Sequence, residues 1–344
     1  WGGAWTAFEG VGQDYSDTLS TLGINQRQRL GLEIQLASNG VYHAIVIAFG
    51  RAIAEVGAVI MVGGNIAGKT RVMTTSIVLE TSKGNMEQAA LLGVLLLILS
   101  LSLVALASMV RQQRTTTKTT VVGEELPRPT PFEERRSVNV RVVKGDRVVV
   151  NDVVIDLEPG TITAVVGESG AGKTTLLKAL AGLEGREVTC GPHACVYVQQ
   201  QPVVFTSSVA SELMLPHRLF PELKPSGKAY SGLFQLNELE GQRVAELSGG
   251  ERQRLVLARQ FSLAPSLLLV DECTSNLGWL HVQTIEQELL RLKEGGTCIV
   301  MVTHNIPQAH RLADRVVVLR EGTSLAADDP FAISLLKGEW IDQS

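Results

Sequence analysis

The sequence predicts an α-helical transmembrane segment joined to an α/β domain, and three features of the 344-residue chain predict this fold class. The run Ala89–Val110 holds no charged residue, and at about 1.5 Å per residue it reaches roughly 33 Å, the thickness of a bilayer's hydrocarbon core. From Val138 onward, short apolar runs alternate with helical patterns, as in a largely parallel sheet flanked by helices. A proline-rich stretch separates these two regions.

The composition excludes several classes of protein. Hydrophobic residues make up 45% of the chain, which is too much for a disordered protein. The net charge of −4 argues against nucleic acid as a partner. Four cysteines in 344 residues do not make a disulfide scaffold.

A second apolar stretch, Val41–Gly63, carries Arg51 and Glu55. One interpretation is a buried amphipathic helix of a soluble domain. The other is a second membrane span whose charges, four residues apart on a helix, neutralise each other. The second is favoured because a single span at 89–110 would have no helix to pack against. The basic residues after that span place its end in the cytoplasm; they are Arg111, Arg114 and Lys118.

Residues 111–136 are predicted to be an extended linker, because prolines 127, 129 and 131 favour an open chain. Residues 1–110 then form the membrane part and residues 137–344 the α/β domain. Four parallel strands are predicted in that domain, each a short apolar run that ends near a glycine or a polar residue. They are Thr161–Val166, Leu267–Val270, Cys298–Val302 and Val316–Leu319.

A phosphate-binding loop is predicted at Gly167–Thr175, which fits G-x-x-x-x-G-K-[ST] between a strand and a helix. Glycines let backbone N–H groups surround a phosphate at a helix N-terminus. Lys173 supplies a positive charge to the β- and γ-phosphates, and the Thr174 hydroxyl is a ligand for Mg²⁺. The expected nucleotide-binding residues are Gly167, Ser169, Gly170, Ala171, Gly172, Lys173, Thr174 and Thr175.

Two acids end the apolar run Leu267–Val270. Asp271 is expected to hold Mg²⁺ through water, as the corresponding acid does in other phosphate-loop enzymes. Glu272 is expected to polarise the water that attacks the nucleotide. Together with the phosphate loop, this pair predicts a nucleotide hydrolase.

The stretch Leu247–Arg254 reads Leu-Ser-Gly-Gly-Glu-Arg-Gln-Arg and resembles the signature motif of ATP-binding cassette (ABC) ATPases. The resemblance covers about residues 138–325. It implies a RecA-like core with antiparallel β and helical subdomains, and two cassettes that act as a dimer. Ser248, Gly249 and Gly250 would then contact the γ-phosphate bound to the opposite subunit.

Two further residues fit the order of motifs in that family. Gln200 lies in a stretch that resembles the Q-loop, which implies contacts with Mg²⁺ and the attacking water. His304 resembles the switch histidine at the end of a strand. With Lys173 and Glu272, these are the expected catalytic residues, and Thr174, Gln200 and Asp271 are the expected metal ligands.

The sequence also departs from the ABC pattern at two places. The stretch Val142–Gly145 offers no aromatic ring to stack on adenine, so we expect aliphatic contact there. Gly278 replaces the acid that normally crosses the dimer interface, which predicts slower or less tightly coupled hydrolysis.

Residues 12–36 resemble the cytoplasmic coupling loop of binding-protein-dependent importers, with Asp17 and Gly23 at its characteristic positions. The resemblance implies a short coupling helix that docks on the ATPase near Gln200 and the helical segment at about 207–246. The first 110 residues would then be the C-terminal part of a permease.

The stretch Ala48–Ile66 resembles molybdate and tungstate permeases, and Thr70–Asn85 is most similar to the tungstate branch. This implies an importer of a tetrahedral oxyanion, with tungstate first. The same machinery acting on molybdate, sulfate or another anion stays open, as does an ABC ATPase that is only anchored in the membrane.

An importer of this kind implies several partners. They are a second copy of the chain, an extracytoplasmic oxyanion-binding protein and membrane lipid, with ATP and Mg²⁺ as cofactors. It also implies a multi-pass protein of the plasma or inner membrane, with its ATPase domain in the cytoplasm. Because only two spans are visible and the chain starts at Trp1 rather than Met, we expect a piece of a longer fusion.

Overall fold

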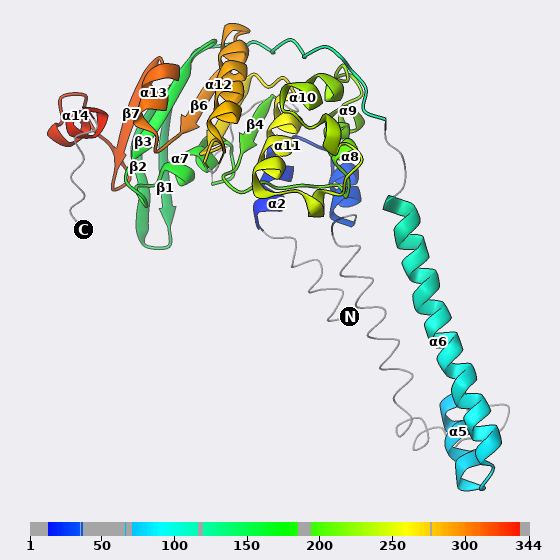
Figure 1. Ribbon diagram of the computed structural model, residues 1–344. Coiled ribbons are helices and arrows are strands. Elements are labelled where there is room, and N and C mark those ends of the chain that lie inside the picture. The colour runs from blue at the N-terminus through cyan, green and yellow to red at the C-terminus, as the bar shows by residue number, and fades with distance from the viewer. Residues whose placement is uncertain are drawn as a thin grey trace. The chain divides into compact units, whose positions relative to one another are not determined.

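The computed structural model describes residues 13–34, 36, 66, 71–115, 120–184, 194–275 and 277–337. The chain divides into two compact units (Figure 1). One contains residues 1–11 and 33–118, and the other contains residues 12–32 and 119–344. Each unit is considered on its own.

In the first unit, helix α5 (Met73–Ser82) packs against helix α6 (Met86–Thr115). The turn between them is held by the Glu80 carboxylate, which accepts hydrogen bonds from Lys83 Nζ at 2.9 Å and Asn85 Nδ2 at 2.8 Å. Large apolar side chains on α6 are 50% to 71% exposed. They are Met86, Leu91, Val94, Leu95, Leu97, Ile98, Leu99 and Leu101.

The predicted membrane spans have different outcomes. Val41–Gly63 lies outside the described residues. Ala89–Val110 falls within α6, whose side chains are described only as far as residue 102. No helix in the described part of the chain combines the length and hydropathy of a membrane span, so this prediction is not borne out.

The second unit is built on a six-stranded sheet in the order β4-β5-β6-β3-β7-β8. The first five strands in that order run parallel, and β8 pairs antiparallel with β7. Their bounds are β3 Ile162–Gly167, β4 Cys195–Val198, β5 Leu267–Asp271, β6 Cys298–Val302, β7 Arg315–Arg320 and β8 Thr323–Ser324.

The four predicted strands are confirmed to within two residues, as β3, β5, β6 and β7. Every residue of β3, β5 and β6 is buried, as expected for parallel strands covered on both faces. Strand β1 (Arg136–Lys144) pairs antiparallel with β2 (Arg147–Leu157), and this two-stranded sheet adds Val140, Val153 and Ile155 to the hydrophobic core.

Helices surround the sheet, with a group of short helices beside its β4 edge (Figure 1). In chain order they are α2 Gln13–Thr21, α7 Lys173–Leu180, α8 Val209–Leu213, α9 Leu215–Leu219, α10 Gly227–Leu233, η1 Asn237–Leu239, η2 Val244–Glu246, α11 Gly249–Phe261, α12 Trp279–Glu294, α13 Ile306–Leu312 and α14 Pro330–Lys337. The architecture therefore contains the predicted α/β core, antiparallel β element and helical segment.

Candidate functional site: a phosphate loop with an acid, glutamine and histidine cluster

The predicted phosphate loop connects β3 to the N-terminus of α7, where the first amides of a helix have no intrahelical partner. Two glycines are required by close backbone contacts. A Cβ on Gly167 would lie 2.1 Å from the Leu319 carbonyl oxygen, and Gly172 combines a φ of +97° with a Cβ position 2.9 Å from the Val149 oxygen. The backbone can take this course only without side chains at these positions.

Lys173 is buried at the start of α7. Its Nζ donates to the carbonyl oxygens of Gly167 at 3.0 Å and Glu168 at 2.7 Å, so the ammonium group is held at the loop. Burial lowers the pKa of Lys173, and the carboxylates of Glu272 and Asp271 oppose this shift. The group is therefore positioned to exchange loop carbonyls for phosphate oxygens.

Asp271 ends β5 and is buried. Burial raises the pKa of Asp271, a hydrogen bond with Thr174 lowers it, and the Glu272 carboxylate raises it further. Thr174 and Asp271 line a cavity of about 180 Å³ together with Gln200. A hydroxyl, a carboxylate and an amide are the oxygen donors that Mg²⁺ prefers, so the residues at this cavity fit the predicted ion.

Two other predicted catalytic residues, Gln200 and His304, contact Glu272. Gln200 Nε2 donates to Glu272 Oε2 at 3.0 Å, and His304 Nε2 lies 2.7 Å from Glu272 Oε1. Glu272 has a φ of +48°, a conformation that is costly for a residue with a side chain and is frequent at functional sites. Its N–H donates to the Val302 carbonyl at 3.1 Å, which ties this backbone conformation to the end of β6.

The predicted signature begins α11. Ser248 is the N-cap, and its N–H donates to Glu251 Oε2 at 2.8 Å, while its hydroxyl accepts from the Glu251 N–H. Gly249 and Gly250 form the first turn. Within the described residues, no hydrogen bond joins these three residues to the phosphate loop. Their action on the nucleotide of a second copy stays a prediction.

The predicted coupling segment docks close to the phosphate site. Asp17 Oδ2 on α2 accepts from Lys178 Nζ of α7 at 2.8 Å, and Thr18 Oγ1 accepts from Gln199 Nε2 at 2.7 Å. Leu19 is buried in the same contact. Gly23 takes a φ of +65° in the turn after α2.

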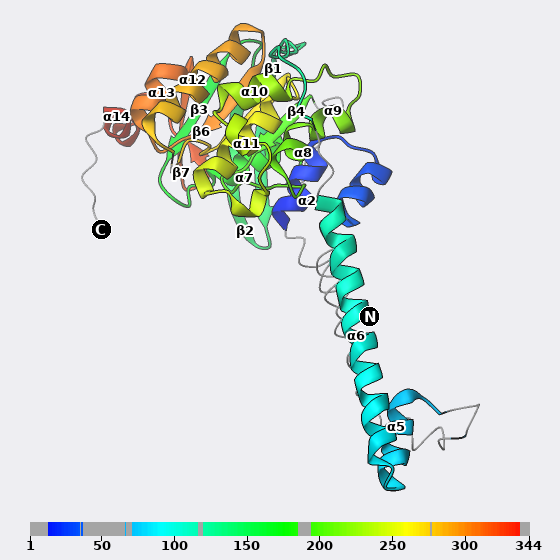
Figure 2. The same cartoon turned by 45° about the vertical axis from the view of Figure 1, so that its right-hand side comes forward.

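The following helical residues, 26–34, extend this contact toward α9 (Figure 2). Gln28 Nε2 donates to the Leu219 carbonyl at 2.7 Å. Near the start of α2, the Tyr15 ring meets Phe205 edge to face, with centroids 6.0 Å apart. Residues 15–28 thus contact the region after β4, the place expected for a coupling helix.

Comparison with known proteins agrees with this geometry. The ABC transporter family profile matches residues 150–275. The aliphatic sulfonates import ATP-binding protein SsuB 1 of Paracoccus denitrificans is 36% identical over 184 residues, which are 52% of this chain and 76% of that protein. The chain belongs to the ABC transporter ATP-binding proteins.

Other relatives of this ABC ATPase carry names that refer to other substrates. The spermidine/putrescine import ATP-binding protein PotA of Haemophilus influenzae is 31% identical, over 58% of each chain. The nitrate import ATP-binding protein NrtC of Synechococcus elongatus is 33% identical over 52% of this chain and 30% of that one. A solved ATP-binding subunit of an ABC transporter has the same fold, with a TM-score of 0.50 and 23% identity, over 55% of this chain and 87% of that one.

As a member of this family, the chain binds and hydrolyses ATP. One of its two departures from the ABC pattern, Gly278, is the residue before α12. A Cβ on Gly278 would meet nothing within 4 Å, and the next residue, Trp279, is 67% exposed. Cys273 directly follows Asp271 and Glu272. Burial raises the pKa of its thiol to about 12, so this thiol is unreactive.

Lys178 and Gln199 were missed by the sequence analysis. Lys178 follows Thr174 by four residues on α7, and both line the same cavity. That helical spacing was a usable signal. Gln199 has no local signal, because its partner Thr18 is 181 residues away.

Proposed function

We propose that this chain is the ATP-hydrolysing part of an importer for a tetrahedral oxyanion, with tungstate as the first candidate, fused to the C-terminal part of its permease. The observation that carries the proposal is that α2 docks on the ATPase through the contacts Asp17–Lys178 and Thr18–Gln199. The docking of a segment with the sequence of a coupling loop beside the phosphate site supports joint action of the two.

In the hydrolysis step, the phosphate loop and Lys173 bind the nucleotide phosphates. Mg²⁺, held by Thr174, Asp271 and Gln200, would supply positive charge to them. Glu272 orients the attacking water and accepts its proton. Gln200 and His304 hold the two oxygens of that carboxylate, which supports a role in aiming it.

Two adjacent glutamines support a path from hydrolysis to transport. Gln200 contacts the catalytic Glu272, while Gln199 contacts Thr18 on the proposed coupling helix. A change at the nucleotide that shifts the backbone at Gln200 would also shift Gln199, because the two residues are adjacent in the chain. The docked helix would then pass this movement to the permease.

The substrate proposal depends on the resemblance of 48–66 and 70–85 to tungstate and molybdate permeases. The relatives' names give sulfonate, nitrate and polyamine import, two of which concern oxyanions. The exposed apolar side chains of α6 support contact with lipid. A second copy of the chain and an extracytoplasmic binding protein complete the proposed assembly, with the ATPase on the cytoplasmic side of the cell membrane.

The test is the ATPase activity of the full-length transporter in liposomes, with its binding protein loaded in turn with tungstate, molybdate and sulfate. We expect stimulation by tungstate alone and its loss in Glu272→Gln. Equal stimulation by all three anions would refute tungstate selectivity. Stimulation by none of the three anions would instead favour an ATPase whose membrane segment is only an anchor.

A further inference from the structure

Residues 120–132, part of the predicted extended linker, lie along the ATPase as a strap (Figure 1). The strap's first contact is with α10. The carbonyl oxygens of Val122 and Gly123 accept from the N–H groups of Lys228 at 3.2 Å and Ala229 at 2.9 Å. These amides belong to the first turn of α10, where helices lack internal acceptors. The strap therefore supplies the N-terminal hydrogen bonds of this helix.

Gly123 makes that contact possible. It has a φ of +91°, and a Cβ there would lie 1.7 Å from the Pro225 carbonyl oxygen. No other amino acid fits without moving the backbone of one segment away from the other. Val121 beside it is buried.

The middle of the strap is held by Arg291 of α12. Its Nη1 donates to the Pro127 carbonyl at 3.1 Å, while Nε and Nη2 donate to Glu288 at 2.8 and 2.7 Å. Glu288 is buried and lies 2.8 Å from the hydroxyl of Tyr230, a residue of α10. One guanidinium thus joins the strap, α12 and, through Glu288, α10.

The end of the strap enters the core. The N–H groups of Thr130 and Phe132 donate to the carbonyl oxygens of Ala264 at 3.3 Å and Gly296 at 3.0 Å. Phe132 is part of the central hydrophobic cluster. Pro129 packs closely on Gly295, because a Cβ added to Gly295 would lie 2.3 Å from Pro129 Cγ. The strap therefore connects the short helices at one end to the sheet at the other.

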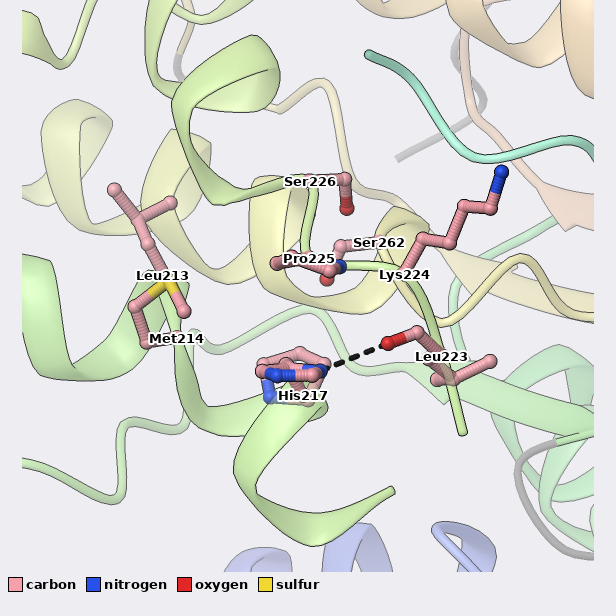
Figure 3. A pocket seen from close by; sticks show the side chains of 9 residues that line it. Leu213, Met214, His217, Leu223, Lys224, Pro225, Ser226 and Ser262 are labelled. Atoms are coloured by element: carbon pink, nitrogen blue, oxygen red, sulfur yellow. Dashed lines mark hydrogen bonds between the residues drawn. The ribbon is translucent and has the colours of Figure 1, made fainter. Parts of the chain in front are cut away.

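Within the described residues, the hollow beside the strap's first contact is not a binding pocket. This hollow is lined by residues of 213–226 and by Ser262, and His217 Nδ1 lies 2.8 Å from the Leu223 carbonyl oxygen in it (Figure 3). It has no space for a molecule the size of water. Packing rather than ligand binding accounts for the contacts between the strap and α10.

Helix α11 connects the contact between Arg291, Glu288 and Tyr230 to the signature. The Tyr230 hydroxyl lies 3.2 Å from the carbonyl oxygen of Phe261, the last residue of α11, and Ser248 caps the other end of α11. A helix of 13 residues is about 20 Å long. A small rotation at the Tyr230 end therefore displaces the signature at the far end.

From these contacts we propose that the strap, anchored by Arg291, positions the signature for hydrolysis. This inference rests on the proposed function and on the predicted action of Ser248–Gly250 on a nucleotide held by a second copy. Arg291, Gly123 and Tyr230 are positioning residues that touch no part of the phosphate site. Release of the strap should lower kcat and change the KM for ATP little, because the phosphate loop and Lys173, which bind the nucleotide within the same copy, are intact.

The test uses Gly123→Ala in the full chain, with Gly241→Ala as the control. Gly241 lies in the same helical region, and a Cβ there meets nothing within 4 Å. We expect the amides of Lys228 and Ala229 to exchange faster in Gly123→Ala only. In the same variant kcat should fall on the order of tenfold, with KM within about twofold.

Arg291→Lys provides a second variant should Gly123→Ala fail to fold. The lysine keeps a charge for Glu288 and loses the fork that also reaches Pro127, so a smaller fall in kcat is expected. Unprotected amides at 228 and 229 in the unmodified chain, or faster exchange without a change in kcat, would overturn the inference. An unmodified chain that hydrolyses no ATP would count against the proposed function instead.

Discussion

The catalytic cluster and the docked α2 lie on either side of two adjacent glutamines, and they are built in different ways. Glu272 and His304 follow neighbouring parallel strands, so their backbones bring them together. The α2 contact depends on side chains separated by more than 160 residues, as in Asp17–Lys178. Catalytic geometry in this ATPase therefore follows from local motifs and strand order, while the link to the proposed permease depends on long-range contacts.

The largest effect that separates the two regions is expected from Glu272→Gln. Loss of the proposed base should reduce ATP hydrolysis by about 10²- to 10⁴-fold, with α2 still docked and ATP still bound. Steady-state hydrolysis and nucleotide binding measure this. Glu294→Gln, a matched change outside the site, should leave both unchanged, and a hydrolysis rate retained in Glu272→Gln would contradict the assigned role.

A second prediction concerns the buried ion pair Glu212–Arg259. Arg259 contacts Phe205, the ring against which Tyr15 of α2 packs. Glu212 also accepts from the Thr206 N–H at 2.8 Å, and the Arg259 guanidinium stacks 4.8 Å from the centre of the Phe205 ring. Arg259→Met leaves a buried carboxylate without its cation, which costs about 3–5 kcal/mol of unfolding free energy. Denaturant unfolding measures the loss.

A double variant separates the cost of leaving Glu212 as an unpaired buried charge from the cost of losing the ion pair itself. Glu212→Gln combined with Arg259→Met removes both ions, so it should recover part of the stability. A double variant less stable than Arg259→Met would show that the pair is not the source of the effect.

Asp17→Lys tests the docking region alone. Repulsion from Lys178 should separate α2 from α7 and reduce substrate-stimulated ATPase activity by roughly 5- to 150-fold, the usual range of coupling between sites. Basal hydrolysis should change little. The exchanged pair Asp17→Lys with Lys178→Asp should restore part of the stimulation, and its failure to do so would argue against this contact.

The smallest effect is a pH dependence at the signature. The Ser248 hydroxyl and then its N–H lower the pKa of Glu251 below its ordinary value of 4.5. A carboxyl group with a lowered pKa stabilises the folded state above its ordinary pKa, and this contribution disappears as pH falls through the lower value. Because Glu251 is only partly buried, solvent screens this interaction and the loss should stay under about 1 kcal/mol.

Unfolding free energies at pH 7 and below pH 4.5 measure this contribution as the difference between the parent and Glu251→Gln. Glutamine keeps the capping geometry but does not titrate. An equal pH dependence in both proteins would show that the cap does not contribute.

Much of the α/β core could be predicted because the runs that became β3, β5, β6 and β7 are short, apolar and bounded by polar residues or glycine, as is typical of buried parallel strands. The phosphate loop could be predicted for a similar reason, since glycines at 167 and 172 are required by backbone contacts that the motif already encodes. The position expected for the coupling segment, near Gln200, agrees with the contacts of α2. The residues that receive it, Lys178 and Gln199, were not identified.

The prediction for residues 111–136 shows the limit of local patterns. Prolines 127, 129 and 131 correctly indicate an extended backbone, but extension does not reveal what the backbone touches. The partners are amides of α10, the guanidinium of Arg291 and two glycines at 295 and 296. In addition, residues 111–115 continue α6 rather than starting a linker.

The sequence by itself determined the strands, the phosphate loop, the acids that follow β5 and membership of the ABC ATPases, because period, glycine placement and motif spacing are local. Only the tertiary structure decided that Gln200 and His304 hold the two oxygens of Glu272, that α2 binds Lys178 and that the proline strap joins α10 to α12. Each of these depends on which surfaces meet after folding, and that outcome is set by packing between segments far apart in the chain.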